Sequence, residues 1–597
     1  MGIDALTHND AGIHAAPASP ETWEQWVSAT RLRGYLLKNT LGDWLNLYGD
    51  ANGFRRDEAF EGYDERLVFA PFIMERGNRF EEAVSRHLAS FHELTTISHG
   101  QDDVRELEVA QQTFHALADG RPIIHQAVLW NPESRTYGAA DFLIRSDVFD
   151  ALFPKHLAPG EAAIAAPDLG GPWHYVVVDA KFTTVHLSKQ GEVGNSGSSP
   201  AYKAQLYVYN DALARLQGYA PRRAFLLGRG WEQSPERGSN AMERLGPVPM
   251  GADVKGEVEG AAAWVRRLRS EGAQWHPLPT PTVPELWPSG VDWPWEKEGK
   301  RITDELEDLT KLWQVGPEKR NSAVRKGITS WKDPRATAET LGVTGPATKT
   351  VLEAILDVHR NDGPVVRPAH VQAAESEWRE QPPLEFFVDF EYVSDLKDNF
   401  STYPERGGQT IIFMIGCGHM EDGKWRFEQF TANRLDEPSE ARAIDAWLAH
   451  MRKTQSRLGG DSDPHLFHWA PAEEINYETA YNSARKRHPA KGWPVVNWFD
   501  LLRKVVRKEP VVVKGSMGFG LKSVARAFHE HGLIKTDWGS SKVDGMGAMV
   551  GAWRCDDEAA ERSVRLLDLP LMQEIAAYNE VDCKVMQEIL HYLRAHH

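Results

Sequence analysis

The sequence predicts an α/β protein in which two α/β regions are joined by a helical connector. Apolar segments of strand length alternate with helical patterns toward both ends of the chain, and such segments are missing between residues 236 and 380. The 597 residues are also too many for one hydrophobic core. We therefore expect a first region at 22–235, the connector at 236–380 and a last region at 383–597.

The first region contains two strand patterns and one long helix pattern. Residues 123–130 (IIHQAVLW) and 175–182 (YVVVDAKF) are apolar runs of strand length. Residues 201–218 place apolar side chains at helical spacing. A segment rich in Pro and Trp, 276–301, then breaks the pattern, which is typical of a connection between regions.

The last region begins with strands and continues with helices interleaved among them. The expected strands cover 384–393, 410–418, 424–432 and 464–470. The expected helices cover 440–453, 475–487, 521–532 and 571–597. This order predicts a mixed sheet with helices packed on it.

Composition indicates the cellular compartment. The cysteines, Cys417, Cys555 and Cys583, are too few and too scattered for a disulfide framework, which favours a reducing environment. The N-terminal residues lack the basic and apolar segments of a secretory signal. The apolar runs are shorter than the roughly 20 residues that span a membrane. We expect a cytoplasmic protein without a membrane partner.

The net charge of −17 disfavours long-range attraction of a polyanion. Positive charge is nevertheless concentrated at residues 484–491 and 503–508. A solvated surface explains either run alone. A local nucleic-acid contact is the alternative, with Arg485, Lys486 and Arg487 as its candidate residues.

Two acids stand inside the apolar strand FFVDFEYV. Asp389 and Glu391 are two residues apart, so their side chains leave a strand on the same face. An edge strand with one solvated face explains them if they are considered alone. Tyr578 and Asp582 lie one helical turn apart in the last helix pattern and also share a face. These four residues are candidates for one site.

A further acid is expected near the end of the strand at 464–470. Glu473 follows His468 by five residues, where the chain turns toward a helix. Glu474 is a neighbouring candidate, and Asp500 is a weaker one after another apolar segment. Several carboxylates cannot crowd together ionised unless cations neutralise them. Hard oxygen ligands select Mg²⁺ or Mn²⁺.

This set of residues resembles the DEDD exonucleases of the ribonuclease-H-like superfamily, in the tyrosine variant. The resemblance implies that Asp389 and Glu391 form the first motif, and Tyr578 and Asp582 the third. In the second motif the family has an aspartate after a His-Asn pair, whereas Trp469 stands here after the histidine and Glu473 takes the place of the acid. The implied activity is removal of nucleotides in the 3′→5′ direction, with two metal ions on the acids and Tyr578 positioning the attacking water.

A second constellation lies in the first region. Asp141 ends one strand pattern, and Asp179 and Lys181 share a face of the next. Gln205 and Tyr209 follow, one helical turn apart. A surface salt bridge explains an isolated Asp-x-Lys pair. The full order resembles the PD-(D/E)XK nucleases of the RecB-like type, with aspartate at position 179 where many members have glutamate.

The RecB-like resemblance implies roles for these residues. Asp141, Asp179 and the Ala180 carbonyl would hold a divalent ion, Lys181 would orient the attacking water, and Gln205 and Tyr209 would position DNA or the metal-bearing strand. The family's first motif pairs a histidine with a glutamate. Glu81 is the matching acid, whereas Phe80 replaces the histidine. Some relatives bind an iron–sulfur cluster through cysteines; residues 28–49 contain none, so we expect no cluster.

The connector offers one weak nucleic-acid motif. Residues 341–356 resemble a helix-hairpin-helix, in which Gly342 and Gly345 would present backbone N–H groups to a phosphate. An ordinary helix N-terminus with Thr344 and Pro346 explains the same residues equally well.

The order of the regions resembles predicted bacterial RecB-like nucleases that carry a C-terminal DEDD domain. This resemblance implies a metal-dependent nuclease acting on DNA, on single-stranded regions or ends, in DNA processing, repair or defence, alongside a helicase or other processing partner. Two alternatives stay open. One is a nucleic-acid-binding scaffold with degenerate sites, and the other is an exonuclease directed at RNA.

Overall fold

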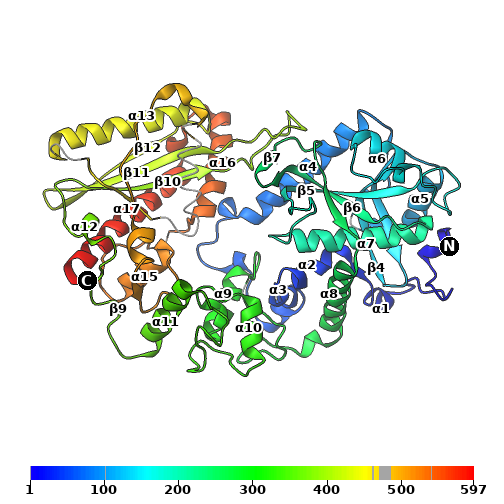
Figure 1. Ribbon diagram of the computed structural model, residues 1–597, viewed down its shortest axis with the longest axis horizontal. Coiled ribbons are helices and arrows are strands. Elements are labelled where there is room, and N and C mark those ends of the chain that lie inside the picture. Colours follow the sequence, from blue (N-terminus) through cyan, green and yellow to red (C-terminus); the bar gives the residue numbers. More distant parts are fainter. Residues whose placement is uncertain are drawn as a thin grey trace. The chain divides into compact units, whose positions relative to one another are not determined.

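The computed structural model describes residues 2–100, 102–288, 290–459, 463–469, 484, 486–539 and 541–597 (Figure 1). Its internal contacts divide the chain into two compact units. Unit 1 consists of Met1–Phe54, Ile73–Gly299 and Asp398–Gly407. Unit 2 consists of Arg55–Phe72, Lys300–Lys397 and Gly408–His597.

The connector expected at 236–380 is not set apart as a third unit. The division falls at Gly299, so its first part packs with unit 1 and its second part with unit 2. Three short strands also lie in this segment, where none was expected: β7, β8 and β9, of two to four residues each. Runs this short carry no readable alternation in sequence.

Unit 1 is organised around a mixed sheet of eight strands. Six of them run in the order β2-β3-β4-β5-β6-β7, while β1 pairs with β4 and β8 with β6. β5 and β6 are parallel, whereas β3, β4 and β5 are successively antiparallel. The strands are β1 (Val27–Ser28), β2 (Leu94–Thr96), β3 (Ile123–Asn131), β4 (Thr136–Arg145), β5 (Tyr175–His186), β6 (Arg223–Gln233), β7 (Glu236–Gly238) and β8 (Gly246–Pro249).

The helices of unit 1 cover this sheet. α4 and α6 contribute Val84 and Phe149 to a core that also contains Phe142 and Val178 from the strands. α7 forms the crossover between β5 and β6. The helices are α1 (Pro20–Trp23), α2 (Arg33–Leu36), α3 (Thr40–Trp44), α4 (Phe69–Ala89, from Ile73 onward in this unit), α5 (Leu107–Ala118), α6 (Ser146–Leu152), α7 (Ser199–Gln217) and α8 (Ala252–Glu271).

Unit 2 contains a five-stranded mixed sheet in the order β12-β11-β10-β13-β14. The first three strands are antiparallel, and β10, β13 and β14 are parallel. A separate antiparallel pair joins β15 to β9. The strands are β9 (Val366–Arg367), β10 (Phe386–Val393), β11 (Ile411–Glu421), β12 (Lys424–Thr431), β13 (Leu466–His468), β14 (Trp498–Asp500) and β15 (Val512–Val513).

Helices cover both faces of the unit 2 sheet, as Figure 1 shows. α13 packs its Trp447 on one face, against Val388 and Phe390. α16 and α17 contribute to the core on the other face, which contains Phe387. The helices are α9 (Glu296–Glu305, which begins in unit 1), α10 (Pro317–Val324), α11 (Pro346–Arg360), α12 (Glu375–Trp378), α13 (Glu437–Thr454), α15 (Leu521–Glu530), α16 (Gly545–Arg562) and α17 (Pro570–His596).

The helix-hairpin-helix expected at 341–356 is not formed. Residues 338–342 are a turn, and only α11 follows it. Gly342 has φ +70°, and Gly345 precedes the Pro346 that opens the helix. The segment is therefore a single helix entered from a turn.

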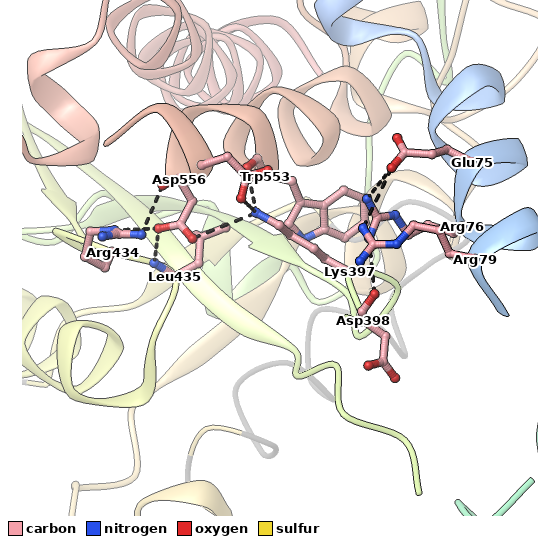
Figure 2. Close-up of polar contacts among 10 residues, drawn as sticks. Glu75, Arg76, Arg79, Lys397, Asp398, Arg434, Leu435, Trp553 and Asp556 are labelled. Carbon is pink, nitrogen blue, oxygen red and sulfur yellow. Dashed lines mark hydrogen bonds and ion pairs between the residues drawn. The ribbon is translucent and has the colours of Figure 1, made fainter. Parts of the chain in front are cut away.

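The loop between β10 and β11 leaves unit 2 and returns. Lys397, the last residue before the excursion, donates to the Trp553 carbonyl oxygen at 2.9 Å within unit 2 (Figure 2). Asp398, the first residue of the excursion, accepts at its carbonyl oxygen from Arg76 at 3.1 Å within unit 1 (Figure 2). Further along, Phe400 joins the unit 1 core. The excursion is therefore anchored by apolar and polar contacts.

None of the helices in the described part of the chain combines the length and the hydropathy needed to cross a membrane.

Candidate functional site

Unit 2 contains a cluster of three carboxylates, one half-buried and two buried. Asp389, Glu391 and Asp582 each place one oxygen within 4.8 Å of the others. Glu391 is 8% exposed and Asp582 is 5% exposed. The two strand acids and the helix acid come together because β10 and α17 are in direct contact.

Close packing of α17 on the sheet makes this cluster. Gly416 of β11 is the register partner of Asp389. A Cβ at this glycine would lie 2.0 Å from the Asn579 side-chain oxygen. Asn579 can therefore reach the sheet, where its Nδ2 donates to Asp389 Oδ2 at 2.8 Å. On the far side of the cluster, Trp538 Nε1 donates to Asp582 Oδ1 at 2.9 Å.

Two further side chains border the acids. Lys522, in the first turn of α15, places its Nζ 4.3 Å from the centre of the Tyr578 ring and donates to the Val543 carbonyl oxygen at 3.1 Å. Burial lowers the pKa of Lys522, although Asp582 and Asp544 oppose that shift. Burial and the nearby carboxylates raise the pKa of Tyr578, so its hydroxyl stays protonated. Lys522 was not expected from sequence, because one lysine in an amphipathic helix carries no signal.

The acids of the cluster hold protons more tightly than ordinary carboxyl groups. Burial raises the pKa of Asp389 to about 6, against the opposing effects of Asn579 and Lys522. Burial and then the charge of Asp389 raise the pKa of Glu391 and of Asp582. The like charges therefore repel in metal-free protein, and a divalent cation would relieve that repulsion.

The second-motif acid cannot be placed. Glu473, Glu474 and Arg485 lie outside the described residues. His468 and Asp500 are register partners in β13 and β14, one position beyond the pair Phe467 and Phe499.

Asp500 does not join the cluster. Phe467 and Phe499 belong to the core on the face of Asp389. Because side chains alternate along a strand, Asp500 lies on the other face. Its Oδ1 instead accepts from the Arg503 backbone N–H at 2.7 Å.

Unit 1 brings its predicted acids together around a lysine. Lys181 Nζ lies 2.7 Å from Asp179 Oδ2 and 3.4 Å from Asp141 Oδ2. The Ala180 backbone N–H also donates to Asp141 Oδ2 at 2.8 Å. Asp179 is 1% exposed, and its Oδ1 accepts no hydrogen bond. Burial and the charge of Asp141 raise the pKa of Asp179, while the two aspartates hold the pKa of Lys181 above its usual value.

Two residues of β3 complete this site. Gln126 Nε2 donates to Glu81 Oε1 and lies 3.4 Å from Asp141 Oδ1, so one amide bridges the two acids. His125 Nε2 lies 3.1 Å from the same Glu81 oxygen. Gln126 has φ +51°, a left-handed conformation that a glutamine rarely adopts. A polar His-Gln pair inside the apolar run IIHQAVLW was the available sequence signal.

These residues open onto a groove that lies entirely in unit 1. The groove has a volume of about 1120 Å³ and is lined by Glu81, Asp141, Lys181, Gln205 and Tyr209. Asp179 lies beneath its floor rather than on its wall. The groove thus joins the acids to the two α7 residues that the sequence pattern associated with them.

Phe80 is a core residue. It is 1% exposed, and its ring centre lies 5.8 Å from that of Phe182 and 5.9 Å from that of Phe400. The position that was compared with the histidine of RecB-like nucleases therefore faces an apolar core in this chain.

The basic residues near 484–491 are engaged by acids of the same unit. Arg487 and His488 pair with Glu440, which is fully buried, and Lys491 pairs with Asp445. Lys486 is exposed. Arg487 and Lys491 are therefore already paired with acids.

The donor sets fit a hard divalent cation. Both sites consist of carboxylate oxygens at the surface of a sheet, which suits Mg²⁺ or Mn²⁺ better than softer metals. Asp179 Oδ1 is a buried oxygen without a hydrogen bond, and the unit 2 acids are mutually repulsive.

No protein-family model matches the chain, and no curated protein matches it either.

Proposed function

We propose that this protein is a metal-dependent nuclease with two separate active sites, one in each unit. The observation that carries the proposal is the carboxylate cluster of Asp389, Glu391 and Asp582. The motif resemblances to DEDDy exonucleases and to RecB-like nucleases support it. We propose DNA as the substrate, as single-stranded regions or ends.

The residues of unit 2 would act together on a strand end. Mg²⁺ or Mn²⁺, when bound, would supply charge neutralisation and activation of water. Asp389, Glu391 and Asp582 would hold the cations. Tyr578, whose hydroxyl keeps its proton, would donate a hydrogen bond that positions the water or the scissile phosphate.

The residues of unit 1 would form the second site. Asp141, Asp179 and Glu81 would hold a cation, and Lys181 would move from the two aspartates toward the phosphate and the attacking water. Gln205 and Tyr209, on the groove wall, would contact the strand.

Separate substitutions test the proposal. Asp389→Asn and Asp179→Asn are compared on end-labelled single-stranded DNA, duplex DNA and RNA, with Mg²⁺ or Mn²⁺. Glu574→Gln on α17 and Asp253→Asn on α8 are matched controls, because both acids are exposed and belong to neither the carboxylate cluster nor the groove lining. We expect each test variant to abolish one cleavage pattern and the double variant to abolish all cleavage. If neither test variant cuts less than its control, both site assignments are wrong.

One observation favours a second function for unit 1. Lys181 and Gln126 already neutralise or bridge its acids, and Phe80 occupies the core. A unit that binds nucleic acid without cutting it is the alternative. Tight binding without metal, together with the absence of products that depend on Asp179 at high Mn²⁺, would select this alternative. Cleavage of RNA with sensitivity to 2′-deoxy substitution at the scissile position would select RNA as the substrate of unit 2.

A further inference from the structure

The groove of unit 1 is lined by three arginines as well as by acids. Arg31, Arg105 and Arg269 line its wall. Burial lowers the pKa of Arg269, and the charges of Arg31 and Arg105 lower it further. Tyr137 and Glu24 oppose this shift, and Arg31 and Arg105 both lie near Arg269 on the groove wall.

No carboxylate in the described part of the chain lies within ion-pair distance of these three arginines. The acids Glu24 and Asp102 also line the groove but form no ion pair with them. Asp43 also lines the groove, and burial raises its pKa to about 7 against the opposing effects of Trp264 and Arg31, so its carboxyl group is only partly charged at neutral pH. Arginines that share a groove wall and belong to no ion pair of the described residues are typical of an anion-binding surface.

Two of the arginines are held in place by fixed partners. Arg269 Nη1 donates to the Trp26 carbonyl oxygen at 2.7 Å and to the Glu24 carbonyl oxygen at 2.8 Å. These contacts leave its other N–H groups available. Arg105 Nε donates to the Tyr137 hydroxyl at 3.2 Å, and its guanidinium lies 5.4 Å from the Trp23 ring centre. Arg105 is exposed, so the outer face of its planar guanidinium is open to solvent.

We propose that Arg31, Arg105 and Arg269 form a track for the phosphates of a single nucleic-acid strand leading to Lys181 and Asp141. This inference rests on the proposed nuclease function. A polyphosphate chain matches an arginine row, because guanidinium groups bind phosphate through paired N–H donors. The open face of Arg105, backed by Trp23, is suited to stacking an unpaired base. Base pairing in a duplex would block that contact.

The test measures binding without cleavage. The probe is a fluorescent oligothymidylate of about 20 nucleotides, titrated in EDTA with protein carrying Asp179→Asn and Asp389→Asn. The affinity is measured over a series of salt concentrations. Each phosphate contact that is lost lowers the slope of log affinity against log salt by about 0.7 for single strands.

We expect Arg31→Gln and Arg105→Gln each to reduce the slope by about that amount. Each variant should weaken the binding of oligothymidylate and of oligoadenylate by a similar factor, because phosphates carry no sequence information. Lysine at the same positions should retain most of the slope. Arg237→Gln on β7 is the matched control, because Arg237 is exposed and outside the groove.

An unchanged slope in the two glutamine variants, or an equal change in the Arg237 variant, would overturn the track. A duplex of the same length bound as tightly, with the same dependence on the two arginines, would overturn the single-strand assignment. Neither result depends on cutting. The proposed function fails separately, if Asp179 and Asp389 prove unnecessary for cleavage in protein with all arginines present.

Discussion

The side-chain amide of Asn579 donates a hydrogen bond of 2.8 Å to Oδ2 of Asp389, across the contact between α17 and β10. Gly416 permits this contact, because any Cβ at that position would collide with Asn579. The geometry of the unit 2 cluster therefore depends on a residue that carries no functional group.

Gly416→Ala should weaken metal binding in unit 2 although every acid of the cluster is retained. The added methyl must displace Asn579 or the helix, at a cost of roughly 1–3 kcal/mol in the free energy of unfolding. We expect a loss of Mn²⁺ affinity, measured by calorimetric titration, that exceeds the effect on unit 1. Gly545→Ala is the control, since a Cβ there meets nothing within 4 Å. Equal Mn²⁺ binding by both variants would contradict this account.

The stability of metal-free protein should fall as the pH rises through the pKa of Asp389. That pKa is raised from 3.8 to about 6, so between these values folded protein holds a proton that unfolded protein has released. The free energy of unfolding from this group therefore declines with rising pH, by roughly 1–3 kcal/mol.

Calorimetric Tm values in EDTA at about pH 5 and about pH 8 check this trend. Asp389→Asn should make it less steep, because the amide does not titrate, while Glu391 and Asp582 continue to contribute. Added Mn²⁺ should stabilise the protein more at the higher pH, since it binds the deprotonated acids. A wild-type protein whose EDTA profile matches that of Asp389→Asn would disprove the assignment.

Gln126→Gly should strengthen metal binding in unit 1. The substitution relieves the left-handed backbone at φ +51° and removes the amide that bridges Glu81 and Asp141. We expect Mn²⁺ affinity to rise at least about threefold, because the acids lose a competing donor. The Mn²⁺ affinity is measured by electron paramagnetic resonance in protein that also carries Asp389→Asn.

Arg135→Gly is the matched control for Gln126→Gly. Arg135 also has a positive φ, +52°, but its side chain is exposed and does not line the groove. A weaker Mn²⁺ affinity in Gln126→Gly than in this control would show that the amide holds Glu81 in place for the cation.

Phe80→His should not restore a metal ligand. The side chain at this position packs between Phe182 and Phe400, so an imidazole there would be buried without a polar partner. We expect a loss of roughly 2–4 kcal/mol in the free energy of unfolding and no gain in Mn²⁺ affinity. Phe80→Leu, which stays apolar, should cost less. Tighter Mn²⁺ binding by the histidine variant would count against a purely structural role.

The sequence predicted the long elements well because they carry strong periodic signals. The expected strand at 384–393 is found as β10, and the helix at 201–218 as α7. Pairs of site residues within one element were also predictable, because two residues on a strand or four on a helix share a face. Asp389 with Glu391 and Asp179 with Lys181 are such pairs.

Partners contributed by other elements were not predictable. Gln126 and Lys522 reach their sites only because the fold brings β3 and α15 there. Neither residue is separated from an acid in sequence by a number of residues that would indicate a shared face. The arginines of the groove come from three separate segments, so no run of positive charge in the sequence indicated them. In the visible basic run near 484–491, Arg487 and Lys491 are instead paired with Glu440 and Asp445.

The excursion at Asp398–Gly407 bears on how the chain can be divided. A fragment ending near Gly299 would lack Phe400 and leave a hole beside Phe80. A fragment starting at Lys300 would lack Phe72, whose ring stacks on Trp553 at 4.5 Å. The core of unit 1 thus includes Phe400 from the second half of the sequence, and the core of unit 2 includes Phe72 from the first half. A single cut of the chain therefore cannot separate the two units with both cores complete.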